Sequence, residues 1–183
     1  PSGRSHVARL TRAPVQRPRD IVGALRTVVF SPIDLAIVRE DPADRRRWLD
    51  SLVTTRWPRM AGVRQDYDRT LKQRNTLLKS MSGRSFHSSG GDAELTLEVW
   101  NEQLATIGAE LLHARLDTLA DVLPHVQDAY LAIAPRNNQV AANYKTVLDI
   151  SSVTPESDVR AALVQILFDA FRERHDEEVR RGV

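Results

Sequence analysis

The residues with the clearest potential chemistry are the cations that recur between residues 45 and 84. Guanidinium and ammonium groups at helical spacing suit contacts with phosphates, and arginine forks orient a nucleic-acid backbone without reading its base sequence. We therefore expect a phosphate-contacting surface. Its candidate residues are Arg46, Arg47, Arg64, Arg69, Lys72, Arg74 and Lys79. A solvated helix face, neutralised by acids elsewhere in the chain, explains the pattern equally well.

The balance of charge along the chain leaves the same two interpretations open. The net charge is only +2, but residues 1–91 contain 18 Lys and Arg against 8 Asp and Glu, whereas residues 92–183 contain 8 against 16. Such a division favours either a basic face for a polyanion or two halves that attract each other. We expect a mixture of both.

Loops that bind nucleotide phosphates are not found in this sequence. A P-loop needs the order G-x-x-x-x-G-K-[ST], and no Gly is followed by Lys here. Residues 88–92 superficially resemble the S-G-G-Q signature of ABC-type ATPases. Their position between two helical patterns favours a flexible connector instead. We therefore expect no cofactor-binding residues in this chain.

Metal and acid/base sites are not predicted either. The sequence has no cysteine, which excludes thiolate metal ligands and disulfides, and His113 and His125 lack a second ligand at metal spacing. The acids of the same region are interpreted as solvated helix charges because no cleft is indicated. These acids are Glu110, Asp117 and Asp121. We expect neither catalytic nor metal-binding residues.

Two helix starts lie ten residues apart in the segment 31–57. Ser31 and Asp41 each precede a proline, and a capping side chain followed by proline at the first helical position is typical of a helix N-terminus. On the second helix, a step of about 100° per residue puts Arg45 within the apolar stripe, with Arg46 at its edge and Arg47 opposite. Arg45 would then need a carboxylate or another negatively charged neighbour.

A long helical hairpin is predicted for residues 58–134. Apolar residues recur every three or four positions over 58–81 and again over 95–134, and a Gly- and Ser-rich connector at 82–91 separates the two runs. We expect the two helices to pack as an antiparallel arm. Gly108 lies beside their seam and allows close approach, and Pro124 should kink or break the second helix.

The segments at both ends predict strands and a closing helix. Residues 1–30 suggest an edge strand, at 6–12, and a connector, while 135–151 contain apolar residues at every second position, which is the pattern of a strand. Residues 154–183 predict the closing helix. A lone amphipathic strand needs a sheet, so we expect a mainly α fold whose few strands belong to a sheet mostly outside this chain.

Several sequence motifs occur together in the chain. They are F-S-P-I-D-L at residues 30–35, I-V at 37–38, P-A-D-R-R-R-W-L-D at 42–50 and Y-D-R-T-L-K-Q-R-N-T-L-L-K at 67–79. They resemble the patterns F-S-P-E-D-L, L-V, P-x-x-R-R-x-F-L-D and Y-x-x-x-L-x-Q-R-N-x-L-L-K of the RecF family of DNA-repair ATPases, and Trp100, 103–104 and 108–109 continue the match. Besides the similar residues Ile37 and Trp48, two positions depart from the patterns: Ile33 replaces the usual Glu, and Glu40 replaces a common Gly.

The resemblance implies a helical lobe of a larger ATPase head of the SMC type. In the family, the whole protein binds ATP with Mg and also DNA, and it works with the RecO and RecR proteins. The family's P-loop, signature and Walker B motifs are not found here, so this lobe should be non-catalytic alone and should contact the remainder of the ATPase head. We expect structural or interdomain roles for Arg45, Asp50 and Trp100.

A second functional class remains open, in which the chain is a helical protein-interaction module without DNA binding. Exposed apolar surface on the arm, together with no concentration of cations on one face, would favour it. A stand-alone hydrolase would need an apposed nucleophile and base, which the sequence does not offer. No apolar run approaches the ~20 residues that span a bilayer, so we expect no membrane association and a cytoplasmic location.

Overall fold

The fold is mainly α, as predicted. The computed structural model describes residues 9–15, 21, 24, 29, 31, 36–39, 41–82, 90–136, 140–153 and 158–183. Two strands lie near the N-terminus, β1 (Arg9–Leu10) and β2 (Ala13–Pro14). The helices are α1 (Ala36–Arg39), α2 (Pro42–Arg56), α3 (Met60–Ser82), α4 (Gly90–Ile133), α5 (Val159–Glu173) and α6 (His175–Arg181).

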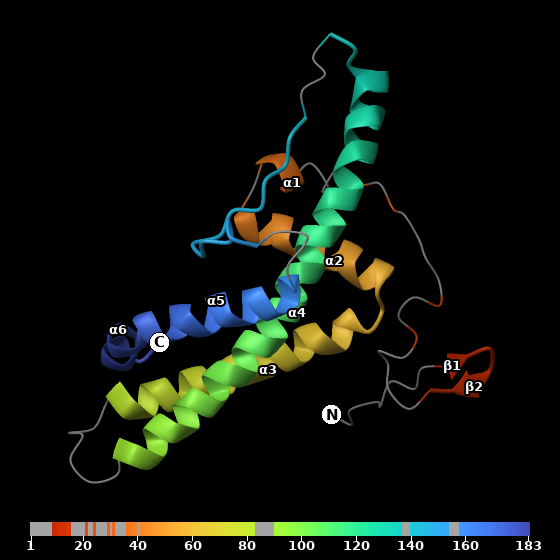
Figure 1. Ribbon diagram of the computed structural model, residues 1–183. Coiled ribbons are helices and arrows are strands. Elements are labelled where there is room, and N and C mark those ends of the chain that lie inside the picture. Colours follow the sequence, from red (N-terminus) through yellow and green to blue (C-terminus); the bar gives the residue numbers. More distant parts are fainter. Residues whose placement is uncertain are drawn as a thin grey trace.

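The 44-residue helix α4 is the central helix, on which α2, α3 and α5 pack (Figure 1). Helix α3 runs antiparallel along its N-terminal half, which confirms the predicted hairpin. Helix α5 lies along another side of α4, α2 crosses it, and α6 packs on α3. Leu97, Leu104 and Leu78 are fully buried along these contacts, as the three- and four-residue spacing predicted.

Helix α2 begins as its sequence predicts. Asp41 is its N-cap, the Asp41 carboxylate accepts a hydrogen bond of 2.7 Å from the backbone N–H of Ala43, and Pro42 occupies the first turn. The carboxylate satisfies one of the N–H groups that a helix start leaves unpaired. The earlier predicted start at Ser31-Pro32 falls largely on residues 32–35, outside the described part, and α1 is described from Ala36.

Gly108 allows α3 and α5 to approach α4 closely. A Cβ atom at this position would lie 3.3 Å from Cε2 of Tyr67 on α3 and 3.4 Å from Cδ1 of Leu167 on α5. Glycine costs a helix up to about 1 kcal/mol relative to alanine. The close packing of α3 and α5 against α4 that Gly108 allows offsets this cost.

Pro124 does not break α4, contrary to one of the two outcomes expected from the sequence. The helix is assigned from Gly90 to Ile133, and its ribbon is continuous in Figure 1. Proline removes one hydrogen bond to the carbonyl four residues earlier, here that of Ala120. Ala120 and Pro124 are both exposed, so water can satisfy the freed carbonyl.

The strand predicted within 135–151 is not formed in the described residues 140–153. The alternation is nevertheless real, because residues 144, 146, 148 and 150 are half-buried while residues 145, 147 and 149 are exposed. The apolar members of the half-buried series are Tyr144, Leu148 and Ile150. These three side chains pack against Ala109, Leu112 and Leu163 of α4 and α5. The alternation therefore indicates an extended segment with one buried side. Within the described residues, this side packs on α4 and α5, and the segment does not pair with a strand.

Other expectations fall at the edge of what is described. The edge strand expected at 6–12 is, from residue 9 onwards, a small antiparallel hairpin in which Arg9 pairs with Pro14 and Leu10 with Ala13. Of the connector expected at 82–91, residues 83–89 lie outside the described part. No helix among the described residues is long and apolar enough to cross a membrane.

Candidate nucleic-acid interface

The cations expected to contact phosphates divide into two groups in the structure. The members of one group, Arg64 and Arg74, pair with acids of other helices. The other group lies on the surface of α3 and at the start of α2. This division decides which residues remain candidates for binding a ligand.

Arg74 belongs to the first of these groups, so its expected role as a phosphate contact is wrong for this fold. It is 3% exposed, and its Nε donates to Oδ1 of Asn101 at 2.6 Å. Its Nη2 pairs with Glu178 of α6, and its guanidinium lies 4.7 Å from the ring centroid of Phe171. The burial of Arg74 could have been predicted from the sequence, because Arg74 precedes Leu78 by four residues and therefore lies on the same side of α3.

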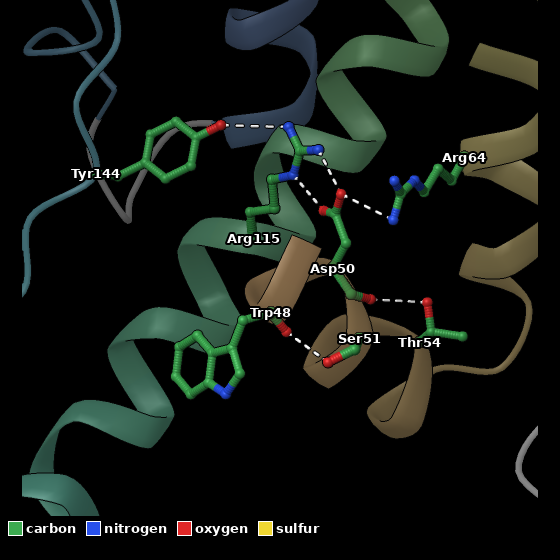
Figure 2. Close-up of polar contacts among 7 residues, drawn as sticks. All are labelled: Trp48, Asp50, Ser51, Thr54, Arg64, Arg115 and Tyr144. Atoms are coloured by element: carbon green, nitrogen blue, oxygen red, sulfur yellow. Dashed lines mark hydrogen bonds and ion pairs between the residues drawn. The ribbon is translucent and has the colours of Figure 1, made fainter. Parts of the chain in front are cut away.

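Arg64 joins a second internal cluster, centred on the carboxylate of Asp50 (Figure 2). Asp50 is 3% exposed. Its Oδ1 accepts from Nε of Arg115 at 2.7 Å and its Oδ2 from Nη2 of Arg115 at 3.0 Å, which is a two-point fork. Nη1 of Arg64 lies 3.1 Å from Oδ2, and Nη1 of Arg115 donates to the hydroxyl of Tyr144 at 3.3 Å. Side chains of α2, α3, α4 and the 140–153 segment thus meet at one point.

Burial and the neighbouring Asp50 shift the pKa of Arg115 in opposite directions. Burial by itself would lower the pKa of its guanidinium, but the hydrogen bond from Arg115 to Asp50, with the neighbouring Tyr144, raises the pKa overall above its ordinary value. Arg115 therefore stays charged, and Asp50 gains a permanent partner. Sequence reasoning missed Arg115 and Tyr144. The available signal was that Arg115 is the sole Lys or Arg between residues 85 and 135.

The expected structural residues other than Asp50 lie in different surroundings. Arg45 is exposed and does not occupy a buried stripe, because α2 packs through Leu49, Asp50 and Val53. Trp100 is half-buried on α4. The expectation that Arg45 lies within a buried apolar stripe is therefore wrong, and the buried charged residue of α2 is Asp50.

The surface group forms one face of α3. A step of about 100° per residue brings Arg69, Lys72 and Lys79 within about 80° of one another, on the side opposite Arg74 and Leu78. All three are exposed. Arg69 pairs with Asp66 of its own helix at 3.1 Å, whereas Lys72 and Lys79 have no acidic partner within the described ranges. We call these three residues the α3 basic face.

The remaining cations of this region are exposed or are paired with acids. Arg46 is exposed, and Arg47 pairs with Asp44 one turn earlier. Two further arginines fasten α2 and the start of α3 to α4: Arg56 pairs with Asp121, and Arg59 with Glu110. Acids of the second half of the chain therefore do neutralise cations of the first half, as one interpretation of the sequence expected. They pair with the arginines near α4 and not with the α3 basic face.

Histidines and acids form no metal site in the described part of the chain. No group of three or more His, Cys, Asp or Glu side chains comes together there. His113 lies 3.4 Å from Asp117, one turn along α4, and His175 lies 3.2 Å from Glu94. Each of these is a simple pair.

Comparison with known proteins confirms the resemblance expected from the sequence. The chain is 50% identical over 188 residues to the DNA replication and repair protein RecF of Cutibacterium acnes, covering 98% of this chain and 48% of the relative. The RecF proteins of Kineococcus radiotolerans and Streptomyces avermitilis are 46% and 45% identical over 99% of this chain. The chain thus spans about half the length of the curated relatives it matches. No protein-family model matches the chain.

Solved structures agree at the level of the fold. A structure of the recombination mediator protein RecF-ATPrS in the RecFOR pathway superposes with a TM-score of 0.79 at 23% identity, over 96% of this chain and 44% of that one. A RecF-ATP structure from the same pathway gives a TM-score of 0.73 at 25% identity, over 94% and 44%. The helical arrangement around α4 is therefore shared with part of a larger protein.

Proposed function

We propose that this chain, similar along nearly its whole length to about half of RecF, is the helical lobe of a RecF-type DNA-repair protein. In this proposal the lobe contributes phosphate contacts to DNA binding. Binding of ATP with Mg, and the work with RecO and RecR, belong to the whole protein in its cytoplasmic setting. The lobe itself carries no catalytic group.

The observation that supports this proposal is the α3 basic face. Its three cations share one side of a helix that is rigidly packed on its other side, so their positions are set before a ligand arrives. Two of them have no acidic partner among the described residues. Cations arranged in this way match the repeating charge of a nucleic-acid backbone, and they orient it without base selectivity.

The salt dependence of DNA binding tests this proposal. The affinity of the chain for a labelled duplex, followed by fluorescence anisotropy, should fall linearly on a log–log plot with salt, with a slope of about −0.9 per neutralised phosphate. Replacing Lys72 and Lys79 by Ala should weaken binding to all sequences alike. It should also make the slope shallower by about 2 units.

A matched control removes two other exposed cations. Arg172→Ala with Arg174→Ala loses the same charge at the end of α5, and it should leave the slope within error of the original. Thermal melting of each variant checks that the fold is kept. Equal loss in both double variants, salt-independent binding or base-selective binding would contradict the proposal.

A protein-interaction role without DNA binding is the alternative, and one observation favours a protein contact. Helix α4 exposes large apolar side chains at Leu95 and Val99. The concentration of cations on α3 is the feature that this alternative does not explain. The same titration separates the two, because a pure protein-interaction module would show no affinity for duplex DNA at 0.1 M salt.

A further inference from the structure

An open groove lies between the N-terminal half of α4 and helix α5. Its apolar lining comes from Val99, Ala105 and Ile107 of α4 and from Val164 and Phe168 of α5, and its volume is about 630 Å³. Val99 of this lining is 60% exposed, and Leu95, one turn before it on α4, is 63% exposed. Large apolar side chains gathered at a groove mark a site for another molecule more often than scattered ones do.

Acidic side chains run along the same part of α4. Glu94, Glu98 and Glu102 are spaced four residues apart and therefore line one side of the helix. Glu94 lies 3.2 Å from His175, whereas Glu98 and Glu102 are exposed and have no cationic partner in the described ranges. Like charges four residues apart destabilise a helix by a few tenths of a kcal/mol. No Lys or Arg occurs between residues 85 and 114 to relieve this repulsion.

The chemistry of the groove selects its occupant. We propose that it binds a basic amphipathic helix of another polypeptide, with the apolar side of that helix on Val99, Val164 and Phe168 and its Lys or Arg side chains against Glu98 and Glu102. In helix-in-groove recognition an amphipathic helix lays its apolar side, with its own anchors at i, i+3, i+4 and i+7, into a hydrophobic groove. Complementary charge steers the partner and sets its orientation.

Two other occupants fit the groove less well. A nucleic-acid backbone would be repelled by the glutamates. The α3 basic face of a second copy offers charge but no apolar side chain, because Arg69, Lys72, Thr76 and Lys79 are all polar. A basic amphipathic helix supplies both kinds of contact. This inference goes beyond the proposed DNA contact, which uses α3.

The test uses a fluorescent 18-residue helical peptide whose Leu residues lie on one side and Lys residues on the other. The full chain should bind it at 0.15 M salt, followed by anisotropy. Glu98→Lys with Glu102→Lys should weaken binding at least tenfold. Val99→Ser, which alters no charge at an exposed position, should weaken it at least threefold.

Controls separate a specific groove from general attraction between opposite charges. Asp66→Lys with Asp68→Lys changes the net charge equally on α3 and should alter affinity less than twofold. A peptide of the same composition with Leu and Lys scrambled should bind at least tenfold more weakly. Equal binding of the scrambled peptide, no effect of Val99→Ser, or equal loss in the α3 variant would overturn the proposal. Sedimentation that shows a dimer abolished by Val99→Ser would also overturn it, by assigning the groove to a second copy.

Discussion

A single carboxylate, that of Asp50, is the point where α2, α3, α4 and the 140–153 segment are joined. Because both Asp50 and the guanidinium of Arg115 are largely withdrawn from water, each depends on the other for the interactions it has lost with solvent. Pairs of this kind contribute little net stability relative to apolar residues, but losing one partner is costly. The cluster therefore acts chiefly on how α2, α4 and Tyr144 are held together.

Replacing Asp50 by Ala should destabilise the chain by about 3–5 kcal/mol, because Arg115 would keep its charge without a partner. Chemical denaturation measures the change. The control is Asp66→Ala, which removes the exposed partner of Arg69 and should cost no more than about 1 kcal/mol. Comparable losses for the two variants would contradict the role given to Asp50.

Tyr67 should make stability fall at high pH. Burial raises the pKa of its phenol above the ordinary 10.0, an effect that the charge of Arg115 partly opposes. Unfolded chains therefore ionise first as the pH passes 10, and stability is lost between that pH and the higher pKa of the folded state. Denaturation from pH 9 to 11 should show a smaller decline for Tyr67→Phe. An identical decline would rule Tyr67 out as the cause.

At the scale of elements, the helices are organised by packing of α3 and of α5 on α4. Leu104 is 1% exposed on α4, in the middle of the seam that the apolar spacing predicted. Leu104→Asp should lower stability by several kcal/mol, because it buries an unpaired charge. Leu95→Asp, at an exposed position of the same helix, should leave the melting temperature nearly unchanged. Unaltered melting of the Leu104 variant would disprove the predicted packing.

The elements that the sequence predicts well are those defined by local interactions. The start of α2 follows from Asp41 and Pro42, and the hairpin follows from periodicity over more than 20 residues. Both depend on neighbours in the chain, which a pattern records directly. The alternation near Tyr144, by contrast, shows that one face is covered but not what covers it, and a helix surface takes the place of the expected sheet.

The candidate site was predictable only in part, because charge type does not show where a side chain points. Arg69, Lys72, Arg74 and Lys79 look alike in the sequence. Their spacing from the buried Leu78 shows that Arg74 lies on the buried side of α3 and that the other three lie on the opposite side. Asp50 and Arg115 are 65 positions apart in the sequence, so no local sequence pattern predicts that they pair.

At the scale of the whole molecule, the proposed function assigns nucleotide binding to the complete RecF-type protein and not to this chain alone. We expect the chain to have no useful affinity for ATP, because residues able to cradle phosphates are not found in it. Isothermal calorimetry with ATP and Mg²⁺ should give no heat of binding. A micromolar dissociation constant would show that the lobe contains a nucleotide site of another design.

Helix α4 continues through Pro124, so a rotation at one end of this helix moves its other end. Its 44 residues extend about 66 Å at 1.5 Å per residue, and its C-terminal end projects past the packed helices in Figure 1. A tilt of about 5° at the projecting end would carry the far end through about 6 Å, since the displacement is the length multiplied by the angle. Neighbouring phosphates of one DNA strand advance about 3.4 Å along the helix axis. If α3 contacts DNA as proposed, a rotation of that size would move the start of α4, and with it the end of α3 that packs there through Leu78 and Met81, by more than one phosphate step.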